Sequence, residues 1–386
     1  VDGHNIQLLL DTFRQAEKVR GPVLVHVATV KGKGYSPAEA DSYKWHGASP
    51  YKIESGQMLK VVGPPMYTEV FGNTLVELAE KDDRIIAVPP AMPAGSGLIK
   101  FAERFPGRMI DVGIAEQHAA TLCAALAMEK MKPVFAVYST FLQRAYDQVV
   151  HDICRQNLNV VFAIDRAGFV GADGETHQGL FDIAFLRSIP NMVLMMPKDE
   201  NELRHMLKTA LDYDGGPIAV RYPRVNGVGV KMDKTLRPIP IGTWEVVRNG
   251  ESVAVLALGP MVQLAEQAAQ LLQPLGISVR IVNARFIKPL DEEMLLQLAR
   301  EGFDIVTVEE GARLGGMGSA VLEFYSDRNI HDIRVKNIAV PDYFVQHGSV
   351  GEQRREVGLT AENLAAHIQS ILQERNKRSG VRHASG

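Results

Sequence analysis

The stretch that decides the fold covers residues 111–120, which read DVGIAEQHAA. A short apolar run ends near Val112, and an alanine-rich helical pattern begins near Ala115. Glu116 therefore falls in the first turn of a predicted helix, at the carboxyl edge of a predicted parallel sheet, where ligands bind in open α/β folds. Taken alone, the segment fits equally well with an ordinary first-turn acid that the helix dipole favours.

The same order of strand, loop and helix recurs on both sides of this stretch. Between Tyr67 and Val225 the pattern predicts strands at 84–88, 109–112, 134–137, 160–164, 193–196 and 218–221, with helices near 68–81, 115–130, 143–157 and 199–212. After Ile241 it predicts strands at 252–258, 278–283, 304–309 and 334–339, with helices near 261–273, 291–299, 316–326 and 360–374. This alternation predicts an α/β fold of successive parallel-sheet domains with helices on both faces.

The remaining segments set the expected domain boundaries. Residues 7–20 predict a helix, and residues 22–30 predict a buried strand that has nothing to pair with locally. Polar stretches rich in Gly or Pro follow at 31–65 and again at 226–241, and the second reads as a linker. We therefore expect domains at 1–60, 61–240 and 241–386, with a frayed polar tail over 376–386.

Composition narrows the class of protein and its partners. The chain has 386 residues, 46% of them hydrophobic, with 42 basic and 45 acidic residues. Without a basic excess, neither nucleic acid nor an anionic membrane is expected as a partner, and no apolar run approaches the ~20 residues of a membrane span. The two cysteines, Cys123 and Cys154, lie in apolar helical patterns and predict reduced, packed thiols, which suits a cytoplasmic protein.

A second segment that could form a functional site follows the predicted strand at 160–164. Residues 165–179 form a long glycine-rich loop that carries Arg166, Asp173 and His177. Loops of this length usually bind ligands or are mobile. A lone histidine is more often structural than catalytic, but three such side chains in one loop favour a functional site.

Two further segments also follow predicted strands. Residues 138–148 read YSTFLQRAYDQ, in which Ser139 or Thr140 could simply cap a helix and the aromatic residues could pack in the core. Residues 221–224 read RYPR. Two arginines after a strand suit a phosphate or a carboxylate, although a pair of solvated arginines is the simpler interpretation of this motif alone.

Together these segments resemble the transketolase-like thiamine-diphosphate enzymes. The matching segments are KGKGY at 31–35, PAM at 90–92, GSG at 95–97, IAEQH at 114–118, YSTFLQRAYDQ at 138–148, DGETHQG at 173–179 and RYPR at 221–224. The resemblance covers essentially the whole chain, and several long motifs in the right order make it specific. It implies that residues 1–60 end a diphosphate-binding domain, that 61–240 form a pyrimidine-binding domain, and that 241–386 form a transketolase-like C-terminal domain.

The resemblance also implies a reaction and its cofactors. Pyruvate would be condensed with D-glyceraldehyde 3-phosphate, with release of CO2, to give 1-deoxy-D-xylulose 5-phosphate for isoprenoid and thiamine synthesis. Thiamine diphosphate and Mg²⁺ are the implied cofactors, and a homodimer is the implied assembly. Glu116 would act on N1′ of the cofactor's pyrimidine, Phe141 would stack on that ring, and Lys31 would also bind the cofactor.

The resemblance also implies the substrate contacts. His46 and His177 would stabilise oxyanions or transfer protons. Tyr138 and Asp173 would contact the acceptor, and Arg166 and Arg224 would hold its phosphate. Guanidinium suits a phosphate because it can donate two parallel hydrogen bonds. Arg221 is the alternative if Arg224 does not hold the phosphate.

One departure from the family is large. The family holds magnesium and diphosphate with a Gly-Asp-Gly motif and a later Asn, and the opening Val1-Asp2-Gly3 is not that motif. We therefore expect no metal site in this chain and a missing upstream stretch of domain size. Two alternatives follow: the chain is the β subunit of a 2-oxo acid dehydrogenase, whose first domain lies on a separate chain, or it is a catalytically inert fragment.

Overall fold

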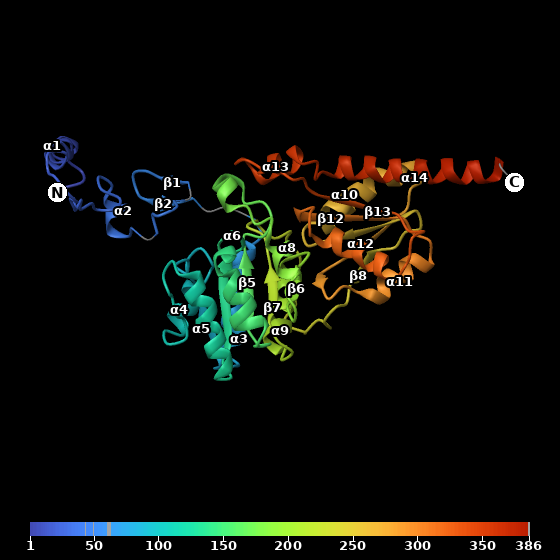
Figure 1. Cartoon of the computed structure of the whole chain (residues 1–386), viewed down its shortest axis with the longest axis horizontal. Helices are drawn as coiled ribbons and strands as arrows, with labels where there is room; N and C mark the ends of the chain where they lie inside the picture. Colours follow the sequence, from blue (N-terminus) through green and yellow to red (C-terminus); the bar gives the residue numbers. More distant parts are fainter. Residues whose placement is uncertain (43, 49, 60–62, 385–386) are drawn as a thin grey trace. The chain divides into compact units, whose positions relative to one another are not determined.

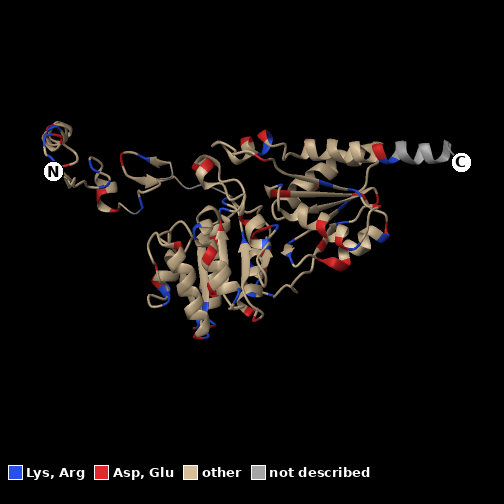
Figure 2. Ribbon diagram, viewed as in Figure 1, with Lys and Arg blue, Asp and Glu red and all other residues tan. Residues whose placement is uncertain are grey.

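The computed structural model describes residues 1–42, 44–48, 50–59 and 63–384, and for residues 376–384 the backbone alone. Contacts divide the chain into two compact units, Val1–Gly63 and Pro64–Gly386, and each is described by itself. Figure 2 shows basic and acidic residues interspersed on the helices of both units. None of the helices in the described ranges is long and apolar enough to cross a membrane.

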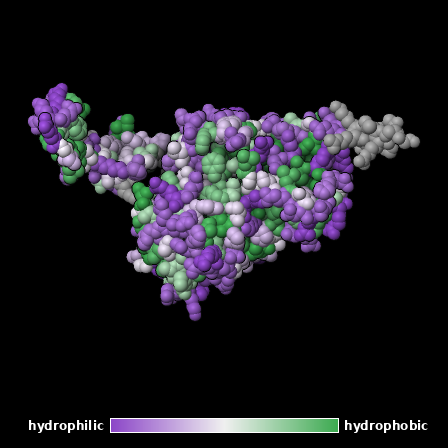
Figure 3. Space-filling model, viewed as in Figure 1, coloured by the Kyte–Doolittle hydropathy of each residue, from purple (hydrophilic) through white to green (hydrophobic). Residues whose placement is uncertain are grey.

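The first unit consists of short elements joined by extended chain (Figure 1). Its described part holds the helices α1 (Ile6–Ala16) and α2 (Ser36–Ala40) and the antiparallel strands β1 (Tyr51–Lys52) and β2 (Gln57–Met58). α1 ends earlier than predicted, and its hydrophobic side chains lie at the surface (Figure 3).

The strand predicted over residues 22–30 is wrong. The backbone there makes an isolated parallel bridge between Asp2 and Ala28, and most of its side chains are exposed. A β-branched run forms a strand only where a neighbouring strand satisfies its backbone N–H and C=O groups. Within this unit the bridge at Asp2 is the only pairing that the described residues offer to this run.

The second unit begins with a six-stranded sheet in the order β11-β6-β7-β5-β4-β3. Its strands are β3 (Ile85–Val88), β4 (Lys132–Tyr138), β5 (Val161–Asp165), β6 (Val193–Met195), β7 (Ile218–Arg221) and β11 (Phe286–Lys288). All pairs are parallel except β11 with β6. The strand predicted at 109–112 is wrong, because Met109 makes only an isolated bridge to Ala87 beside β3.

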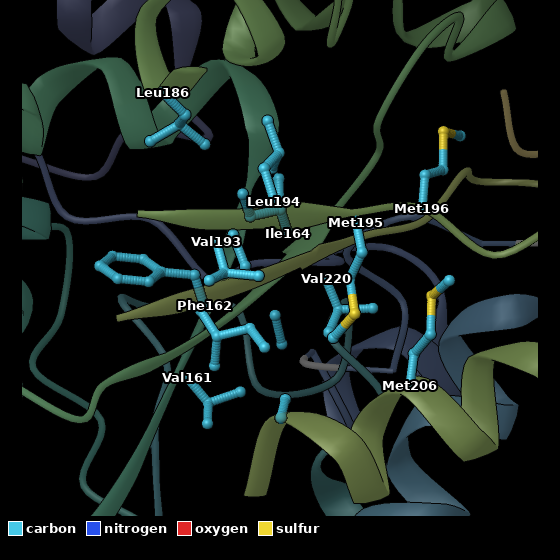
Figure 4. Packing of buried hydrophobic residues seen from close by; sticks show 14 of the residues in the cluster. Val161, Phe162, Ile164, Leu186, Val193, Leu194, Met195, Met196, Met206 and Val220 are labelled. Atoms are coloured by element: carbon cyan, nitrogen blue, oxygen red, sulfur yellow. The ribbon is translucent and has the colours of Figure 1, made fainter. Parts of the chain in front are cut away.

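Helices cover both faces of this sheet. They are α3 (Tyr67–Ala79), α4 (Ile99–Arg104), α5 (Glu116–Met128), α8 (Asp182–Arg187) and α9 (Glu200–Asp212). Figure 4 shows Leu186 of α8 on one side of the sheet and Met206 of α9 on the other, with Leu194 and Met195 between them. The central parts of these strands are apolar because both faces of the sheet are buried. Charged residues stand at some strand ends, such as Asp165 and Arg221.

The helix predicted over 143–157 is broken into shorter turns. The observed elements are α6 (Ser139–Leu142), the 3₁₀ turn η1 (Gln143–Ala145), α7 (Tyr146–Gln148) and the π-helical segment η2 (Val149–Cys154). A π-helical segment of this kind is often found at a functional site. The break begins at Gln143, two residues after Phe141, a predicted site residue.

A five-stranded sheet follows in the order β13-β12-β9-β10-β8. Its strands are β8 (Glu245–Arg248), β9 (Val253–Ala257), β10 (Val279–Asn283), β12 (Ile305–Ala312) and β13 (Val335–Val340). Its helices are α10 (Met261–Leu272), α11 (Glu292–Arg300), α12 (Met317–Asp327), α13 (Val350–Glu356) and α14 (Ala361–Ala384). The tail predicted to be frayed continues α14, whose helical backbone reaches Ala384.

The predicted α/β class is confirmed, with one antiparallel strand at an edge of each sheet. β8 pairs antiparallel with β10, and β11 pairs antiparallel with β6. β11 comes from the C-terminal part of the chain but completes the sheet that begins with β3. The C-terminal part of the chain is therefore joined to the first sheet by β11 as well as by the linking segment.

That linking segment, predicted over residues 226–241, is held by one buried carboxylate. Glu200 accepts hydrogen bonds from the backbone N–H groups of Val228, Gly229 and Val230 at 3.0, 2.7 and 3.0 Å. Gly227 permits this approach, because a Cβ atom at that position would lie 2.4 Å from the Glu200 side chain. The carboxylate thus fixes the start of the linking segment against α9.

Replacing Glu200 by Ala is expected to lower the free energy of unfolding by about 2 kcal/mol, because three backbone donors lose a charged acceptor. Urea unfolding followed by circular dichroism measures the change. The Glu200→Gln variant keeps the side-chain shape and one oxygen acceptor, so it should lose less than the Ala variant. Equal stability of the Ala variant and the unsubstituted protein would contradict this role.

Candidate functional site

The predicted site residues of the second unit gather at one edge of the six-stranded sheet. Because β3, β4, β5 and β7 are parallel, their carboxyl ends meet at that edge. The chain segments that leave it carry Glu116, Tyr138, Phe141, Arg166, Asp173, His177 and Arg224. The location predicted from the sequence pattern is therefore the location at which the fold places these side chains.

An aromatic group forms the centre of this edge. The rings of Tyr138 and Phe141 lie 5.4 Å apart and nearly parallel, at 14°. The ring of His177 meets Phe141 edge-on at 5.5 Å, and its Nδ1 lies 2.8 Å from Thr176 Oγ1. Phe141 is half-buried, so part of its ring remains accessible to a flat ligand.

Arg166 is packed into the protein beside this aromatic group. Its guanidinium lies 3.9 Å from the centre of the Tyr138 ring, and its Nη1 donates to Asp165 at 2.8 Å and to the Gly95 carbonyl at 2.6 Å. Burial raises the pKa of Tyr138 to about 12, and the nearby Arg166 partly offsets that shift. The Tyr138 hydroxyl therefore stays protonated at neutral pH and can donate a hydrogen bond.

Asp173 and Arg224, two predicted substrate contacts, pair with each other. Their carboxylate and guanidinium lie 2.6 Å apart, and each side chain is about one-third exposed, at 31% and 33%. Arg224 also donates to the Val170 carbonyl at 3.3 Å. A bound anion would share or displace this exposed ion pair.

Arg221, the alternative to Arg224, cannot serve a phosphate. Its side chain is fully buried and donates from Nε and Nη2 to the two carboxylate oxygens of Asp182, each at 3.0 Å. The alternative assignment is therefore wrong, because the side chain points into the core rather than past the end of β7. The residue type was right for a phosphate, but the Arg221 side chain is held by Asp182 at the start of α8.

Glu116 is the first residue of α5 and is only 3% exposed. The loop before it is fixed by Asp111, whose carboxylate accepts the backbone N–H groups of Ala91 and Gly113 at 2.9 Å each. The guanidinium of Arg144 lies 3.6 Å from the Glu116 carboxylate. Sequence analysis did not single out Arg144, although it lies in the matching segment three residues after Phe141.

Several buried polar atoms at this edge lack a partner among the described residues. They are Ser96 Oγ, Ser139 Oγ, Arg166 Nε and Tyr222 Oη, which follow β3, β4, β5 and β7. Buried polar groups are almost always hydrogen-bonded in folded proteins. Water or a polar ligand would therefore have to supply the partners that these atoms lack.

His46 and Lys31 belong to the first unit, so nothing relates them to the sheet edge. Both are exposed, and Lys31 Nζ lies against His46 Nδ1. Their assigned roles remain predictions. Among the described residues, no group of three or more His, Cys, Asp or Glu side chains is arranged to hold a metal ion.

A cavity of about 270 Å³ lies at the opposite, amino-terminal edge of the same sheet. Arg84, Lys132 and Tyr213 are among its lining residues. Asp82 already pairs with Arg84 at 2.7 Å and with Lys132 at 3.1 Å, so these two cations are matched by the protein itself. None of the predicted site residues lines this cavity.

Comparison with known families accounts for most of the second unit. Residues 64–228 match the transketolase pyrimidine binding domain, and residues 242–364 match the transketolase C-terminal domain. A protein of Brevibacillus brevis named 1-deoxy-D-xylulose-5-phosphate synthase is 61% identical over 96% of this chain and 59% of its own length. One of the same name from Shouchella clausii is 58% identical over 98% of this chain and 60% of its own. The chain thus spans about three-fifths of these relatives.

Solved structures of transketolases also match this chain. A structure described as "Split gene transketolase, inactive beta4 tetramer" is 32% identical, has a TM-score of 0.71, and matches over 81% of this chain and 99% of its own. A transketolase from Campylobacter jejuni has a TM-score of 0.66 over 80% of this chain and 47% of its own. At 18% identity, that second likeness establishes the fold alone.

Proposed function

The chain belongs to the transketolase family, and on this premise we propose that it is part of a 1-deoxy-D-xylulose-5-phosphate synthase. Such an enzyme is a transferase that condenses pyruvate with D-glyceraldehyde 3-phosphate and releases CO2. The observation that carries the proposal is the sheet edge where buried Glu116 begins α5 beside a half-buried aromatic group. Identity of 61% with a relative of that name supports it.

The cofactor end of the site would be served by Glu116 and Phe141. Thiamine diphosphate, when bound, supplies the carbanion chemistry that decarboxylation of a 2-oxo acid requires. We propose that the Glu116 carboxyl group holds and releases a proton at N1′ of the pyrimidine, and that Phe141 lies on the face of that ring. The unpartnered Ser96 and Ser139 hydroxyls support a polar ring at this edge.

The substrate end would be served by the loop residues and by β4 and β7. We propose that Arg224 and Arg166 hold the acceptor's phosphate, that Asp173 and Tyr138 contact its hydroxyl groups, and that His177 moves a proton. The one-third exposure of Arg224 supports access for an anion. Arg166 is the weaker of the two phosphate ligands, because its Nη1 already bonds Asp165 and Gly95.

Replacing Arg224 by Ala is expected to raise KM for glyceraldehyde 3-phosphate about 30-fold, because charge-assisted hydrogen bonds to the phosphate are lost. KM for pyruvate, which lacks a phosphate, should change less than about twofold by the same argument. Steady-state kinetics with each substrate varied in turn gives both values. Arg300→Ala, an exposed arginine on α11, is the control, and an equal rise in both KM values would remove Arg224 from the phosphate role.

The remaining cofactor, assembly and location are also proposed. Mg²⁺ is proposed as the second cofactor, and none of the described residues is assigned to hold it. Lys31 and His46 would join the site from the first unit. The enzyme would be cytoplasmic and would feed isoprenoid and thiamine synthesis.

A homodimer is also proposed, and its interface would bury some of the large apolar side chains that are exposed on the second unit. Among them, Ile114, Leu314 and Phe344 are 77%, 60% and 66% exposed. Sedimentation at micromolar concentration should give twice the chain's mass, and a monomer would contradict this part of the proposal.

Two assays separate the proposal from its alternatives. Formation of deoxyxylulose phosphate from the two substrates supports the synthase, whereas reductive acylation of a lipoyl domain would identify a 2-oxo acid dehydrogenase.

A second candidate function is that these residues alone are inert. The split-gene relative supports it, because that structure is described as an inactive β tetramer and matches this chain over 99% of its own length. Activity that requires an added diphosphate-binding domain would favour this second candidate.

A further inference from the structure

The base of the glycine-rich loop after β5 rests on side chains of the C-terminal domain. Glu310 of β12 accepts the backbone N–H of Phe169 at 2.8 Å. Gln353 of α13 accepts the N–H of Gly171 at 3.1 Å and donates to its carbonyl at 3.3 Å. Both side chains are almost fully buried, since Glu310 is 3% and Gln353 is 1% exposed.

The contact is close enough to dictate the loop's sequence. Gly168 has a φ of +86°, and a Cβ atom there would lie 2.4 Å from Glu310 Oε1. The other oxygen of Glu310 pairs with Arg354, so the carboxylate is held from both sides. Glycine is therefore needed at position 168 for the loop backbone to reach the C-terminal domain.

The loop has little structure of its own. It contains the short 3₁₀ turns η3 (Gly171–Asp173) and η4 (Glu175–His177) and an isolated bridge between Gly168 and Gly179. Its glycines 168, 171 and 174 have φ values of +86°, +69° and +83°. Glycines in such conformations lose much backbone entropy when they are ordered. Hydrogen bonds from the C-terminal domain therefore add to the few bonds within the loop in fixing its course.

The same loop carries two predicted site residues at its far end. Asp173 pairs with Arg224, and His177 meets Phe141, both on the pyrimidine-binding domain. The loop thus bridges the domains, with its base on the C-terminal domain and its tip at the active-site edge. A shift at the base would move Asp173 and His177 away from the acceptor.

We propose that Glu310 and Gln353 are positioning residues that set the acceptor affinity of the enzyme by holding this loop from the C-terminal domain. The inference rests on the proposed function for the identity of the acceptor, a phosphorylated aldehyde. It gives the C-terminal domain a defined part in a site whose other residues in the second unit lie on the pyrimidine-binding domain. Neither side chain touches the substrate.

The first test measures the loop directly. Hydrogen–deuterium exchange of the peptide covering residues 166–180 should become about tenfold faster in Gln353→Met, which keeps the side-chain volume but loses both hydrogen bonds. Glu310→Gln keeps an acceptor for Phe169 and should accelerate exchange less than Glu310→Met. Gln263→Met removes a different hydrogen bond between the two domains, from Gln263 of α10 to the Lys198 carbonyl. It is the matched control and should leave the peptide unchanged.

The second test measures the consequence for binding. In the holoenzyme, Gln353→Met should raise KM for glyceraldehyde 3-phosphate about tenfold, with KM for pyruvate and affinity for thiamine diphosphate within about twofold. Unchanged exchange in Gln353→Met and Glu310→Met, or equal rises in both KM values, would overturn the proposal. If the unsubstituted enzyme makes no deoxyxylulose phosphate, the proposed function fails, while the exchange result still decides whether these side chains hold the loop.

Discussion

Replacing Glu116 by Gln is expected to lower turnover by about a thousandfold, the range typical of losing a general acid–base group. The amide has nearly the same shape as the carboxyl group, so the packing around this 3% exposed residue should survive. It cannot exchange a proton with the pyrimidine, which is the step assigned to Glu116. Initial rates of deoxyxylulose phosphate formation measure the loss, and thermal unfolding confirms that the fold is kept.

Two neighbouring variants make this result specific. Glu129→Gln removes an exposed acid at the other end of α5 and should leave turnover unchanged. Arg144→Gln removes the cation 3.6 Å from Glu116 and should lower turnover far less than loss of the carboxyl group, because Arg144 is 57% exposed and screened by water. Near-normal activity of Glu116→Gln would contradict the assignment of the proton to this residue.

The central strands of the first sheet were predictable because burial on both faces leaves a clear signal. β4, β5 and β7 are continuous apolar runs that match the predicted ranges within two residues at each end. The runs at 22–30 and 109–112 look similar but pair at isolated positions only. The local sequence pattern indicates whether a segment is apolar. A strand also requires a neighbouring strand for its backbone hydrogen bonds, and the local pattern does not indicate whether one is present.

The two antiparallel edge strands, β8 and β11, were missed for the opposite reason. β8 is half-exposed along its length and carries Glu245 and Arg248, so its pattern resembles that of a loop. β11 contributes only Phe286–Lys288 and joins a sheet whose other strands lie far earlier in the chain. Neither segment carries enough alternation for a sequence pattern to identify it.

The site was predictable at the level of segments but not of contacts. Residue types and loop lengths drew attention to the loop after β5 and to the segment from Tyr138 onwards. Nothing local indicated that Glu310 would hold Phe169, which lies 141 positions earlier in the chain. Likewise, the motif at 221–224 gave no sign of which arginine faces the core, since the answer depends on the register of β7 in its sheet.

Replacing Arg221 by Met is expected to lower the free energy of unfolding by about 4 kcal/mol, because it strands a buried carboxylate without its partner. Arg221 and Asp182 are both fully buried, and Arg221 also donates to the Gly179 carbonyl at the end of the glycine-rich loop. The single variant therefore leaves a charge at Asp182 that the protein interior cannot solvate. Urea unfolding measures the loss.

The partner substitution distinguishes a stranded charge from lost packing. The double variant Arg221→Met with Asp182→Leu removes both charges, so it should recover most of the lost stability. Replacing Arg248 by Met, whose pair with Glu266 is about one-third exposed on both sides, should cost less than about 1 kcal/mol. If the double variant were no more stable than Arg221→Met, the cost would come from packing and from the lost bond to Gly179, and the buried ion pair would not be the cause.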